Sequence, residues 1–115
     1  MSESSLQISV QPLKRVDLIT LAGRVDSNSA PILDNALKES VNNGRHRLVL
    51  ELSQVDYMSS AGLRSLISTL RECKKRNGDL RLAAPSERVT EVFSLAGLDS
   101  LFQVYDDQTT AVGSF

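Results

Sequence analysis

The chain has 115 residues, of which 41% are hydrophobic, and this size suits a single domain over residues 1–115 with a modest aliphatic core. Its 13 basic and 14 acidic residues give a formal net charge of -1, which argues against binding to nucleic acid or to an anionic membrane. The single cysteine, Cys73, cannot form an internal disulfide, and no spacing of ligand residues indicates a metal site. No stretch has the length of a membrane span and no signal peptide is evident, so we expect a cytoplasmic protein with a flexible tail at residues 1–5.

Two strands are predicted at the start of the chain. Residues 6–10 alternate apolar and polar side chains, as a half-buried strand does, and Pro12 ends this strand or marks a sheet edge. Residues 16–22 predict a second strand, which we expect to pair with the first as a hairpin. The segment 23–26 is expected to leave that strand.

The first predicted helix begins at Asn28 or Ser29 and runs to about Asn43. Pro31 fits its first turn, where backbone donors are unpaired, and Gly44 is placed to end it. The residues expected on its inner face are Leu33, Ala36, Leu37, Ser40 and Val41.

A nearly continuous apolar run at residues 46–52 is typical of a central parallel strand that is covered on both faces. It leads into the segment 55–64, where a second helix begins. The basic residues 74–76 would complement the negative end of this helix, which is expected to end at residues 77–78. The apolar residues with helical spacing on its buried face are Leu63, Leu66, Ile67 and Leu70.

Residues 80–83 predict another strand, and Pro85 and Ser86 open a third helix that Gly97 ends. Residues 101–105 predict the last strand, and Asp106 or Asp107 is expected to cap a short helix through Ala111. The third helix is expected to bury Val89, Val92, Phe93 and Ala96.

Strands that alternate with helices predict an α/β domain. The sheet should be mainly parallel, with right-handed crossovers and an antiparallel N-terminal edge hairpin. In such sheets, ligands and partners gather outside the carboxyl ends of the strands. Two of the predicted connections lie there, and they would bring onto one surface Asp26, Ser27, Asn28, Ser59 and Ser60.

Ser59 and Ser60 stand where a strand gives way to a helix. The free N–H groups and the positive end of the helix dipole would stabilise a phosphate on either hydroxyl. A serine at this position is also a common N-cap. From spacing alone, one serine could cap the helix while the other is modified, or the reverse.

The segment Tyr57-Met58-Ser59-Ser60-Ala61-Gly62-Leu63 resembles the signature of STAS domains, the bacterial anti-sigma factor antagonists. The segment 23–26 resembles the Gly-x-hydrophobic-Asp turn of the same family. The resemblance covers nearly the whole chain in element order, and it implies the STAS fold.

The resemblance also implies a phosphorylation switch in a binding protein that is not an enzyme and needs no cofactor. Unphosphorylated antagonists bind an anti-sigma factor that is a serine kinase of the GHKL type, and sigma factor is released. Phosphorylation dissociates the complex, and a PP2C-type phosphatase reverses the modification. The phosphoacceptor position of the family falls on Ser60, with Ser59 as the second choice. The expected partner-binding residues are Asp26, Ser27, Asn28, Ser59, Ser60, Gly62 and Leu63.

One residue departs from the family pattern. Many members carry Asp directly before the phosphoserine, and this chain has Ser59 there, which leaves the kinase partner and the phosphorylation rate open. Tyr57, Met58 and Leu63 are candidate exposed contacts, although core packing is the simpler interpretation, above all for Met58.

Other functions are less well supported. A serine hydrolase would need a base, and the only histidine, His46, is expected at the opposite end of the strand that leads to the signature. A nucleotide is harder to exclude, because helix N-termini attract phosphate, but the sequence has no Gly-rich phosphate loop. The alternative that stays open is a non-switching STAS scaffold subunit of a stress-signalling or lipid-transport complex.

Overall fold

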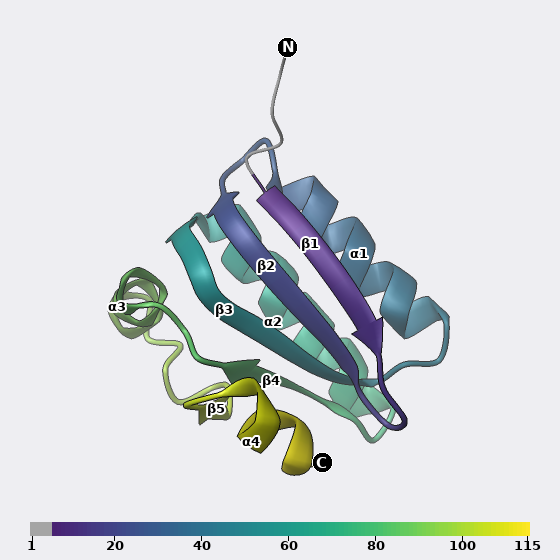
Figure 1. Ribbon diagram of the computed structural model, residues 1–115. Helices are drawn as coiled ribbons and strands as arrows, with labels where there is room; N and C mark the ends of the chain where they lie inside the picture. The colour runs from purple at the N-terminus through teal and green to yellow at the C-terminus, as the bar shows by residue number, and fades with distance from the viewer. Residues whose placement is uncertain (1–5) are drawn as a thin grey trace.

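The computed structural model describes residues 6–115, so the predicted flexible tail at residues 1–5 lies outside the described residues. Five strands form one sheet in sequence order (Figure 1). The first two strands pair antiparallel and all other neighbours pair parallel, which confirms the predicted fold class. The strands are β1 (Leu6–Pro12), β2 (Asp17–Val25), β3 (Arg47–Met58), β4 (Asp79–Ala83) and β5 (Val104–Tyr105).

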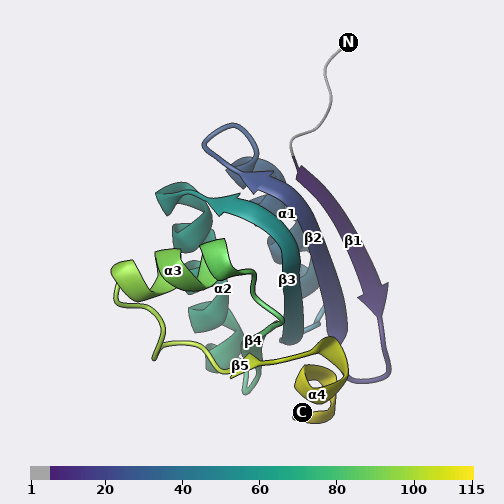
Figure 2. The same cartoon turned by 60° about the vertical axis from the view of Figure 1, so that its left-hand side comes forward.

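Four helices accompany the sheet: α1 (Ala30–Asn42), α2 (Ser60–Lys75), α3 (Glu87–Leu95) and α4 (Gln108–Gly113). Because crossovers between parallel strands are right-handed, a sheet that grows in one direction places its connecting helices on one face. Helices α1 and α2 accordingly lie side by side behind the sheet in Figure 1, and α4 lies in front of it. Figure 2 shows α3 beside the curved part of β3.

The central strand β3 separates two hydrophobic clusters. Leu48, Leu50 and Leu52 belong to the large cluster, together with residues of α1, α2 and α3. Val49 points to the opposite face and belongs to a small cluster with Ala111 of α4. Because successive side chains of a strand face opposite sides, a strand covered on both faces reads as a continuous apolar run, as predicted.

Strand β2 is longer than predicted. It does not end at Ala22 but continues to Val25, so the segment 23–26 does not leave the sheet where expected. Two shifts in the β2–β3 pairing and the positive φ of Gly23 (+109°) let the strand bend while it stays paired with β3. The carboxyl end of β2 is therefore held directly beside that of β3.

Two predictions in the last third of the chain were wrong. Ala96 is exposed and follows α3 as its C-cap residue, because the helix ends at Leu95. The last strand contains Val104 and Tyr105 alone and not residues 101–103. The reason is that the Phe102 ring packs into the core against Phe93, with 5.6 Å between the two ring centroids.

The predicted helix ends agree with the structure at several positions. Gly44 and Gly97 follow α1 and α3 in the left-handed conformation. Ser86 caps α3, and Asp107 caps α4 by accepting a hydrogen bond from the Thr110 N–H at 2.7 Å. Of the helices in residues 6–115, none is long and apolar enough to cross a bilayer.

Candidate partner-binding site

The carboxyl ends of β2 and β3 meet at one edge of the sheet. Val25 is paired with Met58, and the Ser59 N–H donates a hydrogen bond of 2.7 Å to the Val25 carbonyl. The chain continues from one strand into the Asp26 loop and from the other into α2. The two segments that the sequence predicted to share a surface are therefore joined by a backbone hydrogen bond.

The two serines of the signature have different environments. The Ser59 hydroxyl accepts a hydrogen bond from the Gly62 N–H at 3.2 Å, and the Ser59 carbonyl accepts one from the Leu63 N–H at 3.0 Å. Ser59 is therefore the N-cap of α2. Ser60 is the first helical residue, its side chain is exposed, and its hydroxyl has no hydrogen-bond partner within residues 6–115.

Gly62 brings the first turn of α2 close to both strands. A Cβ atom at this position would lie 2.6 Å from the Met58 Sδ and 2.6 Å from the Val25 Cγ1. Gly62 itself is buried, Leu63 is 8% exposed and Met58 is 2% exposed. The close packing of these residues fixes the position of the helix start on the strand ends. The interpretation of Met58 as a core residue is confirmed.

The loop between β2 and α1 is held by Asp26. Its Oδ1 accepts hydrogen bonds from the backbone N–H groups of Asn28 at 3.0 Å and Ser29 at 2.9 Å. The bond from the Ser29 N–H is the largest cause that holds the pKa of Asp26 below its ordinary value. Ser27 and Asn28 are exposed at the tip of this loop.

Ser29 is a structural residue of this loop whose side-chain role the sequence prediction missed. It is 2% exposed, its hydroxyl donates to the Arg24 carbonyl at 2.7 Å, and the same hydroxyl accepts from the Asp26 N–H at 2.9 Å. The reciprocal bonds between residues 26 and 29 follow the three-residue spacing of a capping box. This spacing is the feature of the sequence from which the role of the Ser29 side chain could have been predicted.

Of the three apolar candidates for exposed contacts, Tyr57 alone is exposed, at 39%. The guanidinium of Arg24 lies 4.6 Å from the centroid of its ring. An exposed aromatic ring with a stacked guanidinium has a composition common in protein-binding surfaces.

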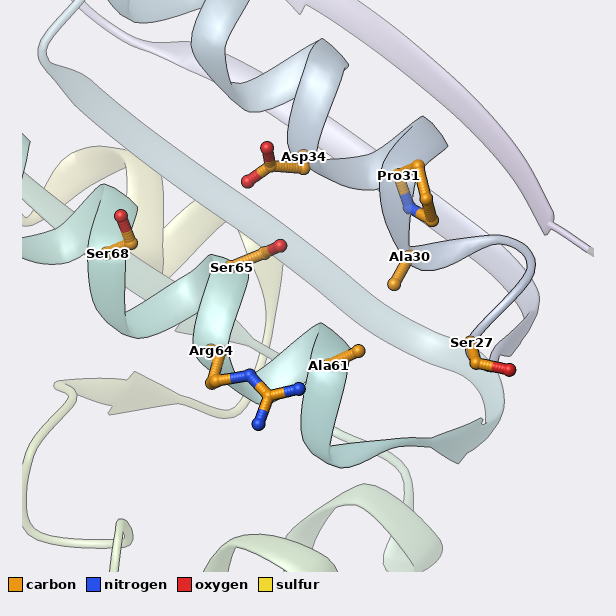
Figure 3. Close-up of a pocket in the computed structure, with 8 residues that line it drawn as sticks. All are labelled: Ser27, Ala30, Pro31, Asp34, Ala61, Arg64, Ser65 and Ser68. Carbon is orange, nitrogen blue, oxygen red and sulfur yellow. The ribbon is translucent and has the colours of Figure 1, made fainter.

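A groove of about 410 Å³ runs between α1 and α2 next to the signature (Figure 3). Arg64 lies one helical turn after Ser60, and Asp34 lies across the groove on α1. The Lys38 ammonium, 2.8 Å from the Asp34 carboxylate, is the main cause of the lowered pKa of Asp34. The sequence prediction missed the groove, because residues about thirty positions apart line it: Ser27, Ala30, Pro31, Asp34, Ala61, Arg64, Ser65 and Ser68.

The site does not have the arrangement of a nucleophilic enzyme. His46 precedes β3, and the whole 12-residue strand separates it from Ser60. Cys73 is fully buried in the core, and burial raises the pKa of its thiol to about 11. In the part of the chain that the structure describes, no three His, Cys, Asp or Glu side chains are grouped so as to hold a metal ion.

Comparison with known proteins identifies the family of the chain. The STAS domain family matches residues 7–111. The protein BtrV of Bordetella bronchiseptica is 31% identical over 110 residues, which cover 96% of this chain and 95% of the relative. The anti-sigma-B factor antagonist of Bacillus subtilis is 34% identical over 86 residues, which cover 75% of this chain and 78% of that protein.

A solved structure has the same fold over nearly its full length. The crystal structure of an anti-sigma factor antagonist from Mycobacterium paratuberculosis superposes with a TM-score of 0.86 at 27% sequence identity. The superposition covers 96% of this chain and 93% of that protein. The chain belongs to the STAS domain family. This assignment agrees with the expectation of a regulatory binding protein rather than an enzyme.

Proposed function

We propose that this protein is an anti-sigma factor antagonist that is switched by phosphorylation of Ser60. In the unphosphorylated state it binds an anti-sigma factor that is a serine kinase of the GHKL type, in the cytoplasm, and thereby frees sigma factor for transcription. Phosphorylation of Ser60 releases the complex, and a PP2C-type phosphatase restores the binding form.

The observation that supports Ser60 most directly is the division of roles between the two serines. The Ser59 hydroxyl is used as the helix cap, whereas the Ser60 hydroxyl is exposed and makes no hydrogen bond to residues 6–115. A kinase can reach an exposed hydroxyl without first opening the helix. The similarity to proteins named anti-sigma-B factor antagonist supports the class of partner.

The proposed partner surface surrounds Ser60. The loop tip at Ser27 and Asn28 and the ring of Tyr57 would contact the partner, while Ser59, Gly62 and Leu63 hold the backbone beneath it in place. Asp26 contributes by fixing the loop with its two backbone hydrogen bonds. The groove between α1 and α2 would receive a partner side chain beside Arg64.

The electrostatic change is large enough to act as a switch. A phosphoserine adds about −1.5 to −2 charges at neutral pH, and a docked interface would have to desolvate them. A cost of about 3 kcal/mol weakens affinity by roughly a hundredfold. At the start of the 16-residue helix α2, the same phosphate is stabilised by the helix dipole, so we expect release without unfolding.

The test is intact-mass and peptide-level mass spectrometry on protein isolated from its native cells under growth and stress conditions. We expect one phosphate on Ser60 whose occupancy changes with conditions. Ser60→Ala should abolish it while the fold and partner binding persist, and Ser60→Asp should weaken binding. Ser59→Ala is the matched control and should still be phosphorylated.

Two results would contradict the proposal. Unchanged phosphate incorporation in Ser60→Ala would move the modification to another residue. Persistent absence of phosphate, with the protein recovered in a stable complex of constant composition, would favour the non-switching scaffold instead.

A further inference from the structure

A second concave site lies at the end of the sheet opposite Ser60. It is a pocket of about 330 Å³ formed by the β1–β2 turn, the α1–β3 loop, the start of β3 and the α2–β4 turn. The β1–β2 turn and the last turns of α1 and α2 gather at this end of the molecule in Figure 1. His46 also lines it. We call it the basic pocket, after its five lysine and arginine side chains: Lys14, Arg15, Arg45, Arg47 and Arg76.

A partly buried ion pair holds two of these loops together. The Arg45 Nε donates to the Asp17 carboxylate at 2.8 Å, and Asp17 is 3% exposed. The same guanidinium donates to the backbone carbonyls of Leu13 and Val16, which flank the β1–β2 turn. The turn that carries Lys14 and Arg15 is therefore fixed against the loop that carries His46.

The third loop is locked by a close backbone contact. The Asp79 N–H donates to the His46 carbonyl at 3.0 Å, and a Cβ atom on Gly78 would lie 1.8 Å from the same carbonyl oxygen. The walls of the pocket are thus set by the fold before any ligand arrives. Such preorganisation lowers the entropic cost of binding.

Three cations of the pocket lack a counter-charge. Within residues 6–115, no carboxylate lies within 4.0 Å of the charged groups of Lys14, Arg15 or Arg47. Arg45 is neutralised by Asp17, and Arg76 is 3.4 Å from Glu72 at an exposed position. Positive charges that converge without partners repel one another, and a multivalent anion would relieve this repulsion.

His46, which also lines the pocket, has an unpaired ring nitrogen. Its Nε2 is the one buried side-chain nitrogen or oxygen atom without a hydrogen-bond partner in the described part of the chain. Buried polar atoms are usually paired, so each exception calls for an explanation. This observation is independent of the charge count at the same pocket.

The lining indicates which kind of anion fits. The α1 and α2 C-termini, which carry partial negative charge, end at this pocket and offset part of the attraction between its cations and an anion. Arginine forks match phosphate oxygens. No Phe, Tyr or Trp lines the pocket, so a nucleobase would have no ring on which to stack. The volume of the pocket is near the lower limit of the usual range for small-molecule sites, about 300–1,000 Å³.

We propose that the basic pocket binds the phosphate groups of a small phosphorylated compound that carries a diphosphate or an equivalent multivalent phosphate. Lys14, Arg15 and Arg47 supply the charge, and the Arg45–Asp17 pair holds them in position. The site lies apart from Ser60, and it does not depend on the function proposed above.

The test is a titration of the full-length protein with pyrophosphate at constant ionic strength, followed by amide NMR spectra. We expect saturable shifts of the Gly44, Arg47 and Gly78 amides and none at Ser60. The double variant Arg15→Gln/Arg47→Gln removes two charged contacts and should weaken binding by at least about tenfold.

The matched control is Arg71→Gln/Arg88→Gln, which removes the same charge at exposed residues outside the pocket and should leave the affinity within about twofold. Thermal melts verify that both variants stay folded. Shifts that grow linearly without saturation, or equal weakening in both double variants, would overturn the proposal. The proposal would also fail if single-stranded DNA bound the pocket and pyrophosphate could not displace it.

Discussion

Replacing Gly62 by alanine tests whether the signature helix is seated as tightly on the strand ends as the structure indicates. The new Cβ would lie 2.6 Å from both the Met58 Sδ and the Val25 Cγ1, whereas carbon contacts are favourable at about 3.5–4.0 Å. Met58 is flexible and can move, but Val25 is fully buried and β-branched, so it cannot. Overpacking of this kind costs about 1–3 kcal/mol.

Part of this cost is offset because alanine is a better helix former than glycine, by at most about 1 kcal/mol. Because the clash with Val25 cannot be relieved, the overpacking cost should fall in the upper half of its range. We expect a net destabilisation of about 2 kcal/mol, or a Tm lower by about 8 °C. Urea unfolding followed by circular dichroism measures this change.

The chain offers a matched control for this substitution. Gly113 lies at the end of α4, and a Cβ atom there would have no heavy atom within 4 Å. Gly113→Ala should therefore change the free energy of unfolding by no more than about 0.5 kcal/mol. If Gly62→Ala were as stable as the unsubstituted protein, the close packing of the helix start on β2 and β3 would be refuted.

Ser59→Ala should lower the free energy of unfolding by about 1 kcal/mol, because it removes the cap of α2, whereas urea unfolding of Ser60→Ala should give nearly the original value; equal losses in the two variants would contradict the division of roles. NMR titration of Asp26 should give a midpoint below its ordinary pKa, because the Ser29 N–H stabilises the carboxylate. The stabilisation of the fold by this carboxylate is present above the unfolded pKa and is lost as pH falls through the folded pKa. An ordinary midpoint would contradict the loop geometry. Cys73 should resist thiol reagents in the folded protein at pH 8 and react in urea. Burial raises the pKa of the Cys73 thiol to about 11. The contribution of this thiol to the stability of the fold is therefore complete below the unfolded pKa and declines as pH rises toward 11. Fast labelling without denaturant would show that the core opens locally.

Much of the local structure follows from the sequence. The apolar run at residues 46–52, the helical spacing of Leu63, Leu66 and Leu70, and Gly44 after the first helix each predicted an element that the structure contains. These signals depend on neighbours within one or two turns, so a single chain segment carries them. The resemblance at the signature then led to the family, which the match over residues 7–111 establishes.

The errors occurred where distant parts of the chain override local preference. Gly23 reads as a strand end, but pairing with β3 carries the strand on to Val25. Ala96 has the spacing of a buried residue, yet α3 has already ended, and residues 101–103 have a strand-like composition but bury Phe102 instead. Pairing and packing with residues far along the chain decide such positions.

The sequence by itself determined the order of the elements, the fold class and the two serines as candidates, because periodicity, caps and the signature are local patterns. Only the tertiary structure decided that Ser59 is the cap and Ser60 is exposed, because that depends on how α2 rests against Val25 and Met58. The basic pocket also needed the structure, since three connections distant in sequence converge on it. Sites of this kind arise from the packing of elements on one another, and no contiguous segment encodes them.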